Sequence, residues 1–593
     1  MNATMYRIFI VPSLIVLGLG SFGMATYLGT PTPIANLILF ATIGIGSIDL
    51  VIETINALRR RHFALDYIAL AAITTGLIAG DYLVTAIIVL MLAGGTTLEH
   101  YASIRARATL SLLKNRIPHH VLRVTKKIEE SIPIEQAHIG DTVKVRTGEV
   151  VPLDGILLSN EAFIDESTLT GEPYSVEKRA GSRVKSGTIN LGPVISLQVE
   201  KIDADSTYRH IVSLVEQAEH EKSPLVRLAD RYSIIFALLT AVIALAAYAL
   251  SGSGERILAV LVMATPCPLL LATPIALLGG VNAALKKQII IKQVASLEIL
   301  DKASALVFDK TGTLTLGAPT VTSITVHTKR YTRKDILAFA RALEQNSLHP
   351  FAKAVIRLAE EEKSKLLSAT SAEERAGEGI SGVIDGRPFR LSRANNIKSM
   401  AADLFEKEEL LATFLFEDVL KPGTAAVIEQ LQKRSLAITL CTGDTAAAAV
   451  RVASQLGGHV TVKANSSPED KQMIIKQLKQ AGKTVVMVGD GINDAPALAQ
   501  ADLGMVFSHS EQTAASEAAD VVFLGGNVEA VVDSILIAKR TIRIAITGIL
   551  IGMGLSVIGM ILAAFGEIPP LVGALLQEGI DVAVILYALR ASR

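Results

Sequence analysis

The sequence has few cysteines, no excess of charge of either sign and little charge in total. Two cysteines in 593 residues exclude a disulfide scaffold and a zinc site built from CxxC pairs. Lys plus Arg and Asp plus Glu each number 57, and this balance argues against nucleic-acid binding, which needs a basic surface. Charged residues make up 19% and hydrophobic residues 50% of the chain, against about 25% charged in soluble domains. The chain is therefore neither wholly soluble nor intrinsically disordered, and its length predicts several domains.

Long apolar runs account for the shortage of charge. A helix that crosses a membrane needs about 20 apolar residues, and eight segments fit: residues 7–28, 34–56, 64–80, 82–98, 232–251, 256–280, 542–565 and 569–589. The first is not read as a cleavable signal, because it lacks a small-residue cleavage site and a second span follows closely. We therefore expect an integral membrane protein in a lipid bilayer, with eight transmembrane helices.

Basic residues predict the orientation of this bundle. They follow the second, fourth, sixth and eighth spans: Arg59–Arg61, Arg105, Arg107, Lys286, Lys287, Arg590 and Arg593. Excess Lys and Arg mark the cytoplasmic side, so both termini and the large polar segments at 117–225 and 295–535 are expected in the cytoplasm. The membrane is expected to be a bacterial plasma membrane. A receptor with passive soluble domains would have the same layout, so the motifs must decide.

An aspartate follows a short apolar run in the second polar segment. Residues 303–315 read ASALVFDKTGTLT, and residues 305–308 predict a buried parallel strand. Asp309 stands at its carboxyl end, where open α/β sheets bind ligands. The following turn of small residues can present backbone N–H groups to a phosphate. Asp309 is therefore a candidate carboxylate nucleophile.

Two later apolar runs end in a similar way. Residues 437–440 precede Thr442 and Asp444, and residues 485–488 precede the segment 489–494, which reads GDGIND. Helix-like stretches separate the three runs. This order predicts a doubly wound sheet with one active edge.

The residues at this edge suit phosphoryl transfer, which needs a nucleophile, neutralising charge and a divalent cation. Lys471 and Thr442 can hold the phosphoryl oxygens. Asp490, with help from Asp494, offers the hard oxygen ligands that Mg²⁺ prefers.

Together these motifs resemble the P-type ATPases, whose phosphorylated motif is DKTGT and whose hinge motif is GDGxNDxP; residues 490–496 read DGINDAP. The resemblance covers nearly the whole chain. It implies that ATP phosphorylates Asp309 and that Asp309 and Asp490 hold Mg²⁺. Soluble phosphatases of the haloacid-dehalogenase type usually carry an acid/base aspartate two places after the nucleophile. Thr311 takes that place in this sequence, so the aspartyl phosphate should persist. Thr311 is also a candidate for the magnesium site, and Asp444 is a candidate catalytic residue.

The resemblance also predicts two accessory sites. In the family, a TGE loop of the actuator domain brings its glutamate to the aspartyl phosphate, and Glu172 is the matching residue; it would position or deprotonate the attacking water. The inserted segment resembles the family's nucleotide-binding domain, with His349 expected to pack on adenine. Its other expected contacts are Glu344, Gly377 and Gly379. Leu348 departs from the glutamate usual beside that histidine.

The sixth span carries the candidate cargo site. Thr265-Pro266-Cys267-Pro268 places prolines inside a membrane helix, where they kink it and where broken backbone lines a site. The Cys267 thiolate is a soft metal ligand, and Thr265 adds oxygen. An isolated cysteine would more often be a packed apolar residue. The motif resembles the heavy-metal-transporting (P1B) subfamily, in its Thr-Pro-Cys variant; the eight spans fit as well.

The eighth span carries two acidic residues. Glu578 and Asp581 are three apart, on one side of a helix, and ionisable residues inside a membrane are functional candidates. They could complete the site with Cys267, or satisfy polar backbone elsewhere in the bundle. Gln577 replaces the histidine of the His-Glu-Gly motif found in divalent-ion members. One thiolate with carboxylates suits a divalent ion, whereas Cu⁺ would prefer more sulfur.

The expected fold is a multi-domain membrane protein. It combines an eight-helix transmembrane bundle, a mostly-β actuator domain, and an α/β haloacid-dehalogenase-like phosphorylation domain with an inserted α+β nucleotide-binding domain. The expected boundaries are 1–112 (transmembrane helices 1–4), 113–225 (actuator), 226–290 (helices 5–6), 291–316 with 416–535 (phosphorylation), 317–415 (nucleotide-binding) and 536–593 (helices 7–8). Terminal metal-binding domains are expected to be absent, since the first span begins near residue 7.

The resulting hypothesis is ATP-driven export of a divalent transition-metal cation, of the Zn²⁺, Co²⁺, Ni²⁺, Fe²⁺ and Cd²⁺ class, through an aspartyl phosphate. The direction is implied by the resemblance. A Cu⁺ exporter is the alternative within the family. A membrane-tethered phosphatase and a non-catalytic metal sensor are the alternatives outside it.

Overall fold

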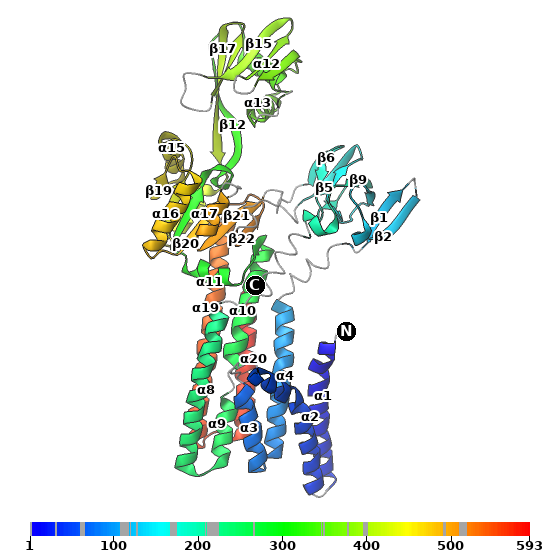
Figure 1. The fold of residues 1–593 in the computed structure, drawn as a ribbon, viewed down its shortest axis with the longest axis vertical. Helices are drawn as coiled ribbons and strands as arrows, with labels where there is room; N and C mark the ends of the chain where they lie inside the picture. The colour runs from blue at the N-terminus through cyan, green and yellow to red at the C-terminus, as the bar shows by residue number, and fades with distance from the viewer. Residues whose placement is uncertain are drawn as a thin grey trace. The chain divides into compact units, whose positions relative to one another are not determined.

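The computed structural model describes most of the chain between residues 3 and 592 (Figure 1). It does not describe residues 1–2, 30–31, 60–65, 107–117, 119, 126–127, 167–174, 208, 210–223, 265–266, 346, 348–349, 376–378, 395–400, 490–493, 509–518 and 593. The described residues form two units. One comprises residues 1–302, 520–525 and 533–593, and the other residues 303–519 and 526–532.

The described residues of all eight predicted spans are almost entirely helical. The helices are α1 (Ala3–Tyr27), α2 (Thr32–Arg59), α3 (Asp66–Ala79), α4 (Tyr82–Ala106), α8 (Pro224–Ser251), α9 (Gly254–Met263), α10 (Cys267–Lys286), α19 (Glu529–Phe565) and α20 (Pro570–Ala588). The sixth span is divided between α9 and α10, as the prolines predict. The helices that contain the fifth and seventh spans begin before the predicted apolar stretches, because polar turns extend α8 and α19 at their amino-terminal ends.

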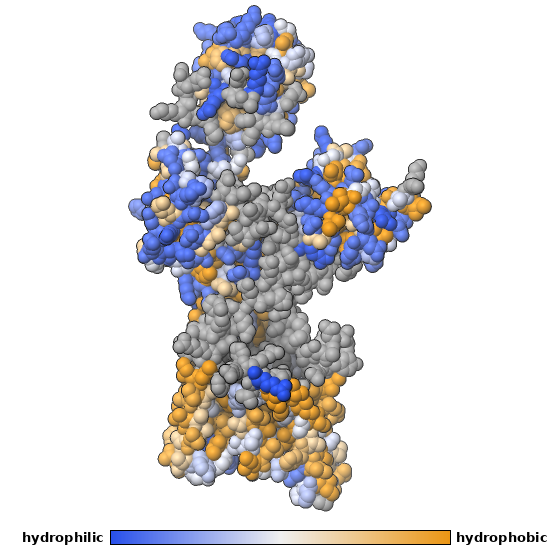
Figure 2. All heavy atoms as spheres, in the orientation of Figure 1, coloured by the Kyte–Doolittle hydropathy of each residue, from blue (hydrophilic) through white to orange (hydrophobic). Residues whose placement is uncertain are grey.

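The surface of the bundle is apolar. Figure 2 shows hydrophobic atoms over most of the helical face in view. On α8 the exposed fractions are 65% for Leu238, 63% for Val242 and 67% for Leu245. Of the described helices, four are long and apolar enough to cross a membrane unaided, and α3 and parts of α2 and α4 form shorter apolar helices. A surface of this kind is stable in lipid, where helices satisfy their own backbone hydrogen bonds.

The segment after α4 is mostly β, as predicted. Its larger sheet has the strand order β2-β1-β3-β9-β4-β7 and its smaller sheet the order β6-β5-β8. The strands are β1 (His120–Thr125), β2 (Ile128–Pro133), β3 (Thr142–Val145), β4 (Gly155–Leu157), β5 (Glu161–Asp165), β6 (Ser175–Arg179), β7 (Arg183–Val184), β8 (Ile189–Asn190) and β9 (Ile195–Val199).

A buried aspartate ties this β domain together. Asp154 precedes β4 and is 6% exposed. Its Oδ1 accepts hydrogen bonds from the backbone N–H and hydroxyl of Ser186, both at 2.7 Å. Its Oδ2 accepts from the N–H and hydroxyl of Thr207, at 2.9 and 2.7 Å. Residues distant in the sequence are thereby joined where the chain leaves the sheet.

The second unit contains a doubly wound parallel sheet with the strand order β21-β20-β11-β18-β19. The strands are β11 (Ala305–Asp309), β18 (Ala437–Cys441), β19 (Val460–Lys463), β20 (Val485–Gly489) and β21 (Leu503–Ser508). The helices between them are α14 (Thr424–Gln432), α15 (Ala446–Leu456), α16 (Pro468–Gln480) and α17 (Ala495–Gln500). β11 is buried throughout, as expected for an apolar central strand.

An antiparallel sheet is inserted between β11 and β18 along the chain. Its strand order is β12-β17-β16-β15-β14-β13. The strands are β12 (Thr315–Val326), β13 (Thr370–Arg375), β14 (Gly379–Ile384), β15 (Arg387–Arg393), β16 (Ala401–Glu406) and β17 (Glu409–Leu420), and the helices are α12 (Arg333–Glu344) and α13 (Pro350–Glu361). Leu337, Leu404 and Phe414 are fully buried in its core. The predicted α+β insertion in an α/β domain is therefore confirmed.

Candidate active site

Three parallel strands deliver polar side chains to one edge of the sheet. Asp309 is the last residue of β11, Thr442 follows β18, and Asp494 follows the undescribed residues after β20. The exposed fractions are 8% for Asp309, 2% for Thr442 and 3% for Asp494. Because parallel strands end at a common edge, residues 185 positions apart (494 − 309) meet in one buried site.

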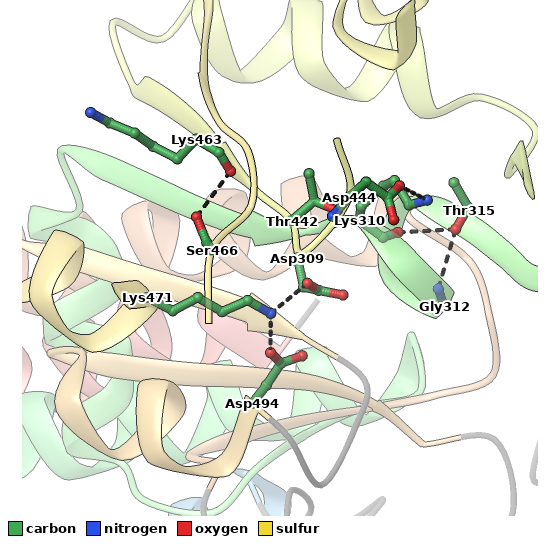
Figure 3. A network of polar contacts seen from close by, with 10 residues as sticks. All are labelled: Asp309, Lys310, Gly312, Thr315, Thr442, Asp444, Lys463, Ser466, Lys471 and Asp494. Atoms are coloured by element: carbon green, nitrogen blue, oxygen red, sulfur yellow. Dashed lines mark hydrogen bonds and ion pairs between the residues drawn. The ribbon is translucent and has the colours of Figure 1, made fainter. Parts of the chain in front are cut away.

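Lys471 holds the two carboxylates together (Figure 3). Its Nζ donates to Oδ1 of Asp309 and to Oδ1 of Asp494, both at 2.6 Å. It lies in the first turns of α16, which begins with a capping box between Ser467 and Asp470 and with Pro468 in its first turn. These features fix the start of the helix and so determine where Lys471 points.

Two negative groups share this single ammonium. Burial lowers the pKa of Lys471, but attraction to Asp309 and Asp494 outweighs burial, and the pKa is raised overall. Burial, followed by repulsion from Asp494, raises the pKa of Asp309 against the opposing effect of Lys471. The site therefore has more negative charge than Lys471 alone balances. Buried carboxylate oxygens are hard donors, so Asp309 and Asp494 fit an additional Mg²⁺ ion.

The turn after Asp309 is bent and anchored. Gly312 has φ 72°, a left-handed conformation that favours glycine, and its N–H donates to Thr315 Oγ1 at 3.2 Å. Lys310 forms an ion pair with Asp444, so Asp444 orients the neighbour of Asp309. Among the hydrogen bonds of the described residues, none joins Asp444 to Asp309 itself (Figure 3). Thr311 is exposed.

Two residues that the sequence did not single out also hold this turn. Asp418, near the end of β17, accepts hydrogen bonds from Thr315 Oγ1 at 2.5 Å and from the N–H of Gly317 at 3.1 Å. Lys421 Nζ donates to the carbonyl of Gly312 at 2.5 Å. Asp418 belongs to the last strand of the inserted sheet and Lys421 follows that strand, so the pairing of β12 with β17 brings both to the turn.

The candidate nucleotide residues are partly described. Glu344 ends α12 and is 5% exposed, and burial followed by repulsion from Glu374 raises its pKa to about 7. Gly379 begins β14 with φ 119°, and a Cβ there would lie 2.1 Å from the carbonyl oxygen of Leu391. The neighbouring strand thus explains Gly379 without a ligand. His349 and Gly377 lie outside the described residues.

Part of the candidate membrane site is described, on α19 and α20. Gln577 Nε2 donates to Asp581 Oδ1 at 3.0 Å, and Gln577 Oε1 accepts from Ser556 Oγ at 3.0 Å. Their exposed fractions are 0% for Gln577, 8% for Asp581 and 1% for Ser556. Glu578 is only half-buried. Gln577, one turn before Asp581, therefore lies on the same buried face of α20 as Asp581, and Glu578 does not.

Two members of this chain of hydrogen bonds, Gln577 and Ser556, are not among the cargo residues predicted from the sequence. Gln577 is four residues before Asp581, a helical spacing that was available as a signal. Ser556 comes from another helix, and no sequence signal identifies it. The side chain of Cys267 and residues Thr265, Glu172 and Asp490 lie outside the described part of the chain, which contains no group of three or more His, Cys, Asp or Glu that could hold a metal.

Comparisons with known proteins agree with this architecture. A family model described as haloacid dehalogenase-like hydrolase matches residues 303–502. A second model, described as P-type ATPase actuator domain, matches residues 115–216.

Similar proteins are named for several metals. A Mycobacterium tuberculosis (strain H37Rv) protein named "Probable copper-exporting P-type ATPase V" is 33% identical over 539 residues, which cover 86% of this chain and 70% of that protein. An Alkalihalophilus pseudofirmus protein named "Probable cadmium-transporting ATPase" is 28% identical over a region that covers 95% of this chain and 83% of that protein. The crystal structure of a zinc-transporting PIB-type ATPase in the E2.Pi state aligns with a TM-score of 0.67 and 28% identity, over 99% of this chain and 100% of that one.

Proposed function

We propose, from the premise that this chain belongs to the heavy-metal (P1B) P-type ATPases, that it exports a divalent transition-metal cation from the cytoplasm. Members of this family hydrolyse ATP, use Mg²⁺ and transport heavy-metal ions across a membrane. The observation that supports a working catalytic cycle is the buried Asp309–Lys471–Asp494 cluster.

In the proposed first step, a carboxylate oxygen of Asp309 attacks the γ-phosphorus of ATP. The new bond is the acyl phosphate, the bond to ADP breaks, and ADP leaves with its electron pair. In this proposal Lys471, whose Nζ contacts Asp309 Oδ1, and the Thr442 hydroxyl hold the transferring oxygens, since preorganised positive charge is the main requirement of this transfer. Bound Mg²⁺ would be held by Asp309, Asp494 and Asp490, and would neutralise phosphate charge.

In the proposed second step, water hydrolyses the acyl phosphate with help from Glu172. The alternative acid/base position next to Asp309 carries Thr311, whose hydroxyl is too weak an acid and base for that role. Hydrolysis therefore depends on the actuator domain. This dependence makes the phosphoenzyme long-lived and gives the ion site time to change its access.

The proposed cargo site combines Cys267 and Thr265 at the helix break with Asp581, Glu578 and the Gln577–Ser556 hydrogen bonds. A thiolate with carboxylates suits Zn²⁺, Cd²⁺, Co²⁺, Ni²⁺ or Fe²⁺. The second candidate is Cu⁺, which the names of the M. tuberculosis relative and other copper-transporting relatives favour.

The test measures ATPase activity of the purified protein in lipid vesicles with Zn²⁺, Cd²⁺, Co²⁺, Ni²⁺, Fe²⁺ and Cu⁺. We expect stimulation by divalent ions, lost in Cys267→Ala and in Asp309→Asn. Cys441→Ala is the matched control, because Cys441 is the only other cysteine and is buried in β18; it should retain the stimulation. Stimulation by Cu⁺ alone would contradict the proposal of a divalent cargo and support Cu⁺ as the transported ion.

A second measurement separates a pump from a membrane-tethered phosphatase. Radiolabelled γ-phosphate from ATP should label the wild type in a form that hydroxylamine removes, and should not label Asp309→Asn. Rapid turnover of phosphate esters without an accumulating phosphoenzyme would favour the phosphatase.

A further inference from the structure

A short 3-10 turn, η5 (Leu589–Ser592), follows α20 and is seated on α10. A Cβ on Gly279 of α10 would lie 3.0 Å from the backbone nitrogen of Ser592 and 3.2 Å from Ala591 Cβ. Ala591 itself is 2% exposed. The missing side chain of Gly279 thus lets the backbone of η5 approach α10 closely, and this contact fixes the position of the turn.

Basic side chains from two further helices reach η5. Lys286, in the last turn of α10, donates from Nζ to the carbonyl of Ser592 at 2.8 Å. Arg540 of α19 donates from Nη2 to the carbonyl of Arg590 at 2.9 Å. The two carbonyls are two residues apart, about 4 Å along a 3-10 helix. Arg590 lies over the ring of Tyr587, with Cζ 5.8 Å from the ring centroid. Lys286, Arg540 and Arg590, the basic cluster, therefore gather around one short turn.

The charges of the basic cluster are not balanced by the described part of the protein. All three residues are exposed, and no carboxylate of a described residue forms an ion pair with any of them. Two acidic residues of neighbouring elements already have cations. Asp533 accepts from Lys287 Nζ at 2.7 Å, and Asp301 of α11 (Ala295–Lys302) is within electrostatic range of Lys539. Three like charges around one turn repel each other, so an external anion would stabilise this arrangement.

The basic cluster lies where the apolar surface of the bundle ends. On α20, Leu586 stands four residues before Arg590 (590 − 586) and is 60% exposed. On α19, Leu550 follows Arg540 by ten residues (550 − 540), just under three turns, and is 67% exposed. Tyrosine beside such a boundary is typical of the membrane interface. The cluster is therefore at the level expected for lipid headgroups.

We propose that the basic cluster binds the headgroup of an anionic phospholipid, whose acyl chains lie against the exposed apolar residues of α19 and α20. Basic pockets between membrane helices are suited to such headgroups. The guanidinium groups of Arg540 and Arg590 match the geometry of a phosphate, and the ammonium of Lys286 adds a third charge. A zwitterionic headgroup carries a cation beside its phosphate, which the cluster repels, so a headgroup of net negative charge is preferred. This inference does not depend on the identity of the cargo.

The competing explanation is that these cations only cap η5 and orient the bundle. Cations near a helix carboxyl end interact favourably with its last carbonyls, and basic residues mark the cytoplasmic side of a membrane protein. Neither role needs a bound lipid. The two explanations therefore differ in whether removal of these charges changes the affinity for one class of lipid.

The experiment titrates the full chain in detergent, without metal or ATP, with phosphatidylglycerol or phosphatidylcholine. Native mass spectrometry gives the apparent dissociation constant of the first bound lipid. Each cation near an anionic lipid contributes about five-fold in affinity. We therefore expect Lys286→Gln to weaken phosphatidylglycerol binding about five-fold, and Lys286→Gln with Arg540→Gln and Arg590→Gln to weaken it about 100-fold. Binding of phosphatidylcholine should not change.

Lys287→Gln is the matched control, because Lys287 is the next residue and its charge is already paired with Asp533. It should bind phosphatidylglycerol as the wild type does. Equal weakening in Lys286→Gln and Lys287→Gln would show a general effect of charge and would overturn the site. Unchanged binding in Lys286→Gln would also overturn it, and this single substitution keeps the test decisive if the triple variant does not fold.

A second measurement separates a lipid site from a site for a soluble phosphate. The melting temperature of the wild type should be higher in vesicles that contain phosphatidylglycerol than in pure phosphatidylcholine, because a bound lipid stabilises the folded protein. Lys286→Gln should show a smaller difference, and Lys287→Gln the wild-type difference. Glycerol 3-phosphate in phosphatidylcholine vesicles supplies the phosphate without the acyl chains and should have no effect. An equal rise with glycerol 3-phosphate would overturn the lipid as the occupant. Because neither measurement uses metal or ATP, failure of the proposed function would leave both results unchanged.

Discussion

Removal of Lys471 is predicted to destabilise the phosphorylation domain strongly. Its ammonium is the partner of two buried carboxylates, Asp309 and Asp494, at 2.6 Å each. Removing one member of a buried ion pair costs about 3–5 kcal/mol, because the remaining charge is left without a partner. Lys471→Met keeps the length of the side chain and removes the charge, so it isolates this electrostatic contribution.

The expected loss can be converted into a melting temperature. The second unit contains somewhat more than 200 residues. In a domain of that size the melting temperature falls by about 2–4 °C for each kcal/mol lost from the free energy of unfolding. Lys471→Met should therefore melt about 10 °C below the wild type at neutral pH without Mg²⁺. Intrinsic fluorescence of tyrosine or circular dichroism of the detergent-solubilised protein follows this transition.

A second substitution distinguishes electrostatics from lost packing. Asp494→Asn, combined with Lys471→Met, removes one of the two unpaired charges and should recover part of the melting temperature. Added Mg²⁺ should raise the melting temperature of Lys471→Met more than that of the wild type. The reasoning is refuted if Lys471→Met has the same melting temperature as the wild type, or if the double variant melts at a lower temperature than Lys471→Met.

Three further predictions concern other buried groups. The pKa of Glu344 is raised from 4.5 to about 7, so the free energy of unfolding of the wild type should fall by about 3 kcal/mol as the pH rises from the lower to the higher of these values. Glu344→Gln should remove this pH dependence, and in thermal melts at pH 8 it should be more stable than the wild type. Asp154→Ala should lower the free energy of unfolding of the actuator domain by about 3–5 kcal/mol, because it leaves four hydrogen-bond donors unsatisfied. Resistance to protease measures this loss, and Asp205→Ala, at an exposed position, should be as resistant as the wild type. Gln577→Leu should raise the half-stimulating metal concentration about 10- to 100-fold by releasing the Asp581 carboxylate, with phosphorylation by inorganic phosphate retained.

The sequence predicted the catalytic edge well because its geometry follows from local rules. The three apolar runs that precede Asp309, Thr442 and Gly489 are strands, each one residue longer than predicted. Parallel strands end at a common edge, so the chemistry at their ends meets without further information. The capping pattern before Lys471 likewise fixes the start of its helix.

The membrane site could not be predicted to the same depth. The contact between Ser556 and Gln577 depends on how far each helix is rotated and shifted against its neighbour. Apolar spans carry little information about rotation, because lipid and core both accept leucine and isoleucine. The prediction that Glu578 shares the face of Asp581 was drawn from spacing alone, and the structure gives the fully buried position to Gln577.

The described surroundings of Asp309 also bear on the choice between a pump and a phosphatase. A phosphatase of this fold needs a group beside the acyl phosphate that can take a proton from water. Lys471 cannot do so at neutral pH, because the two carboxylates raise the pKa of its ammonium and keep it protonated. Asp444 is engaged by Lys310, and Thr311 has only a hydroxyl. Among these three described residues, none therefore offers a free base to water, and this favours the proposed pump over the phosphatase.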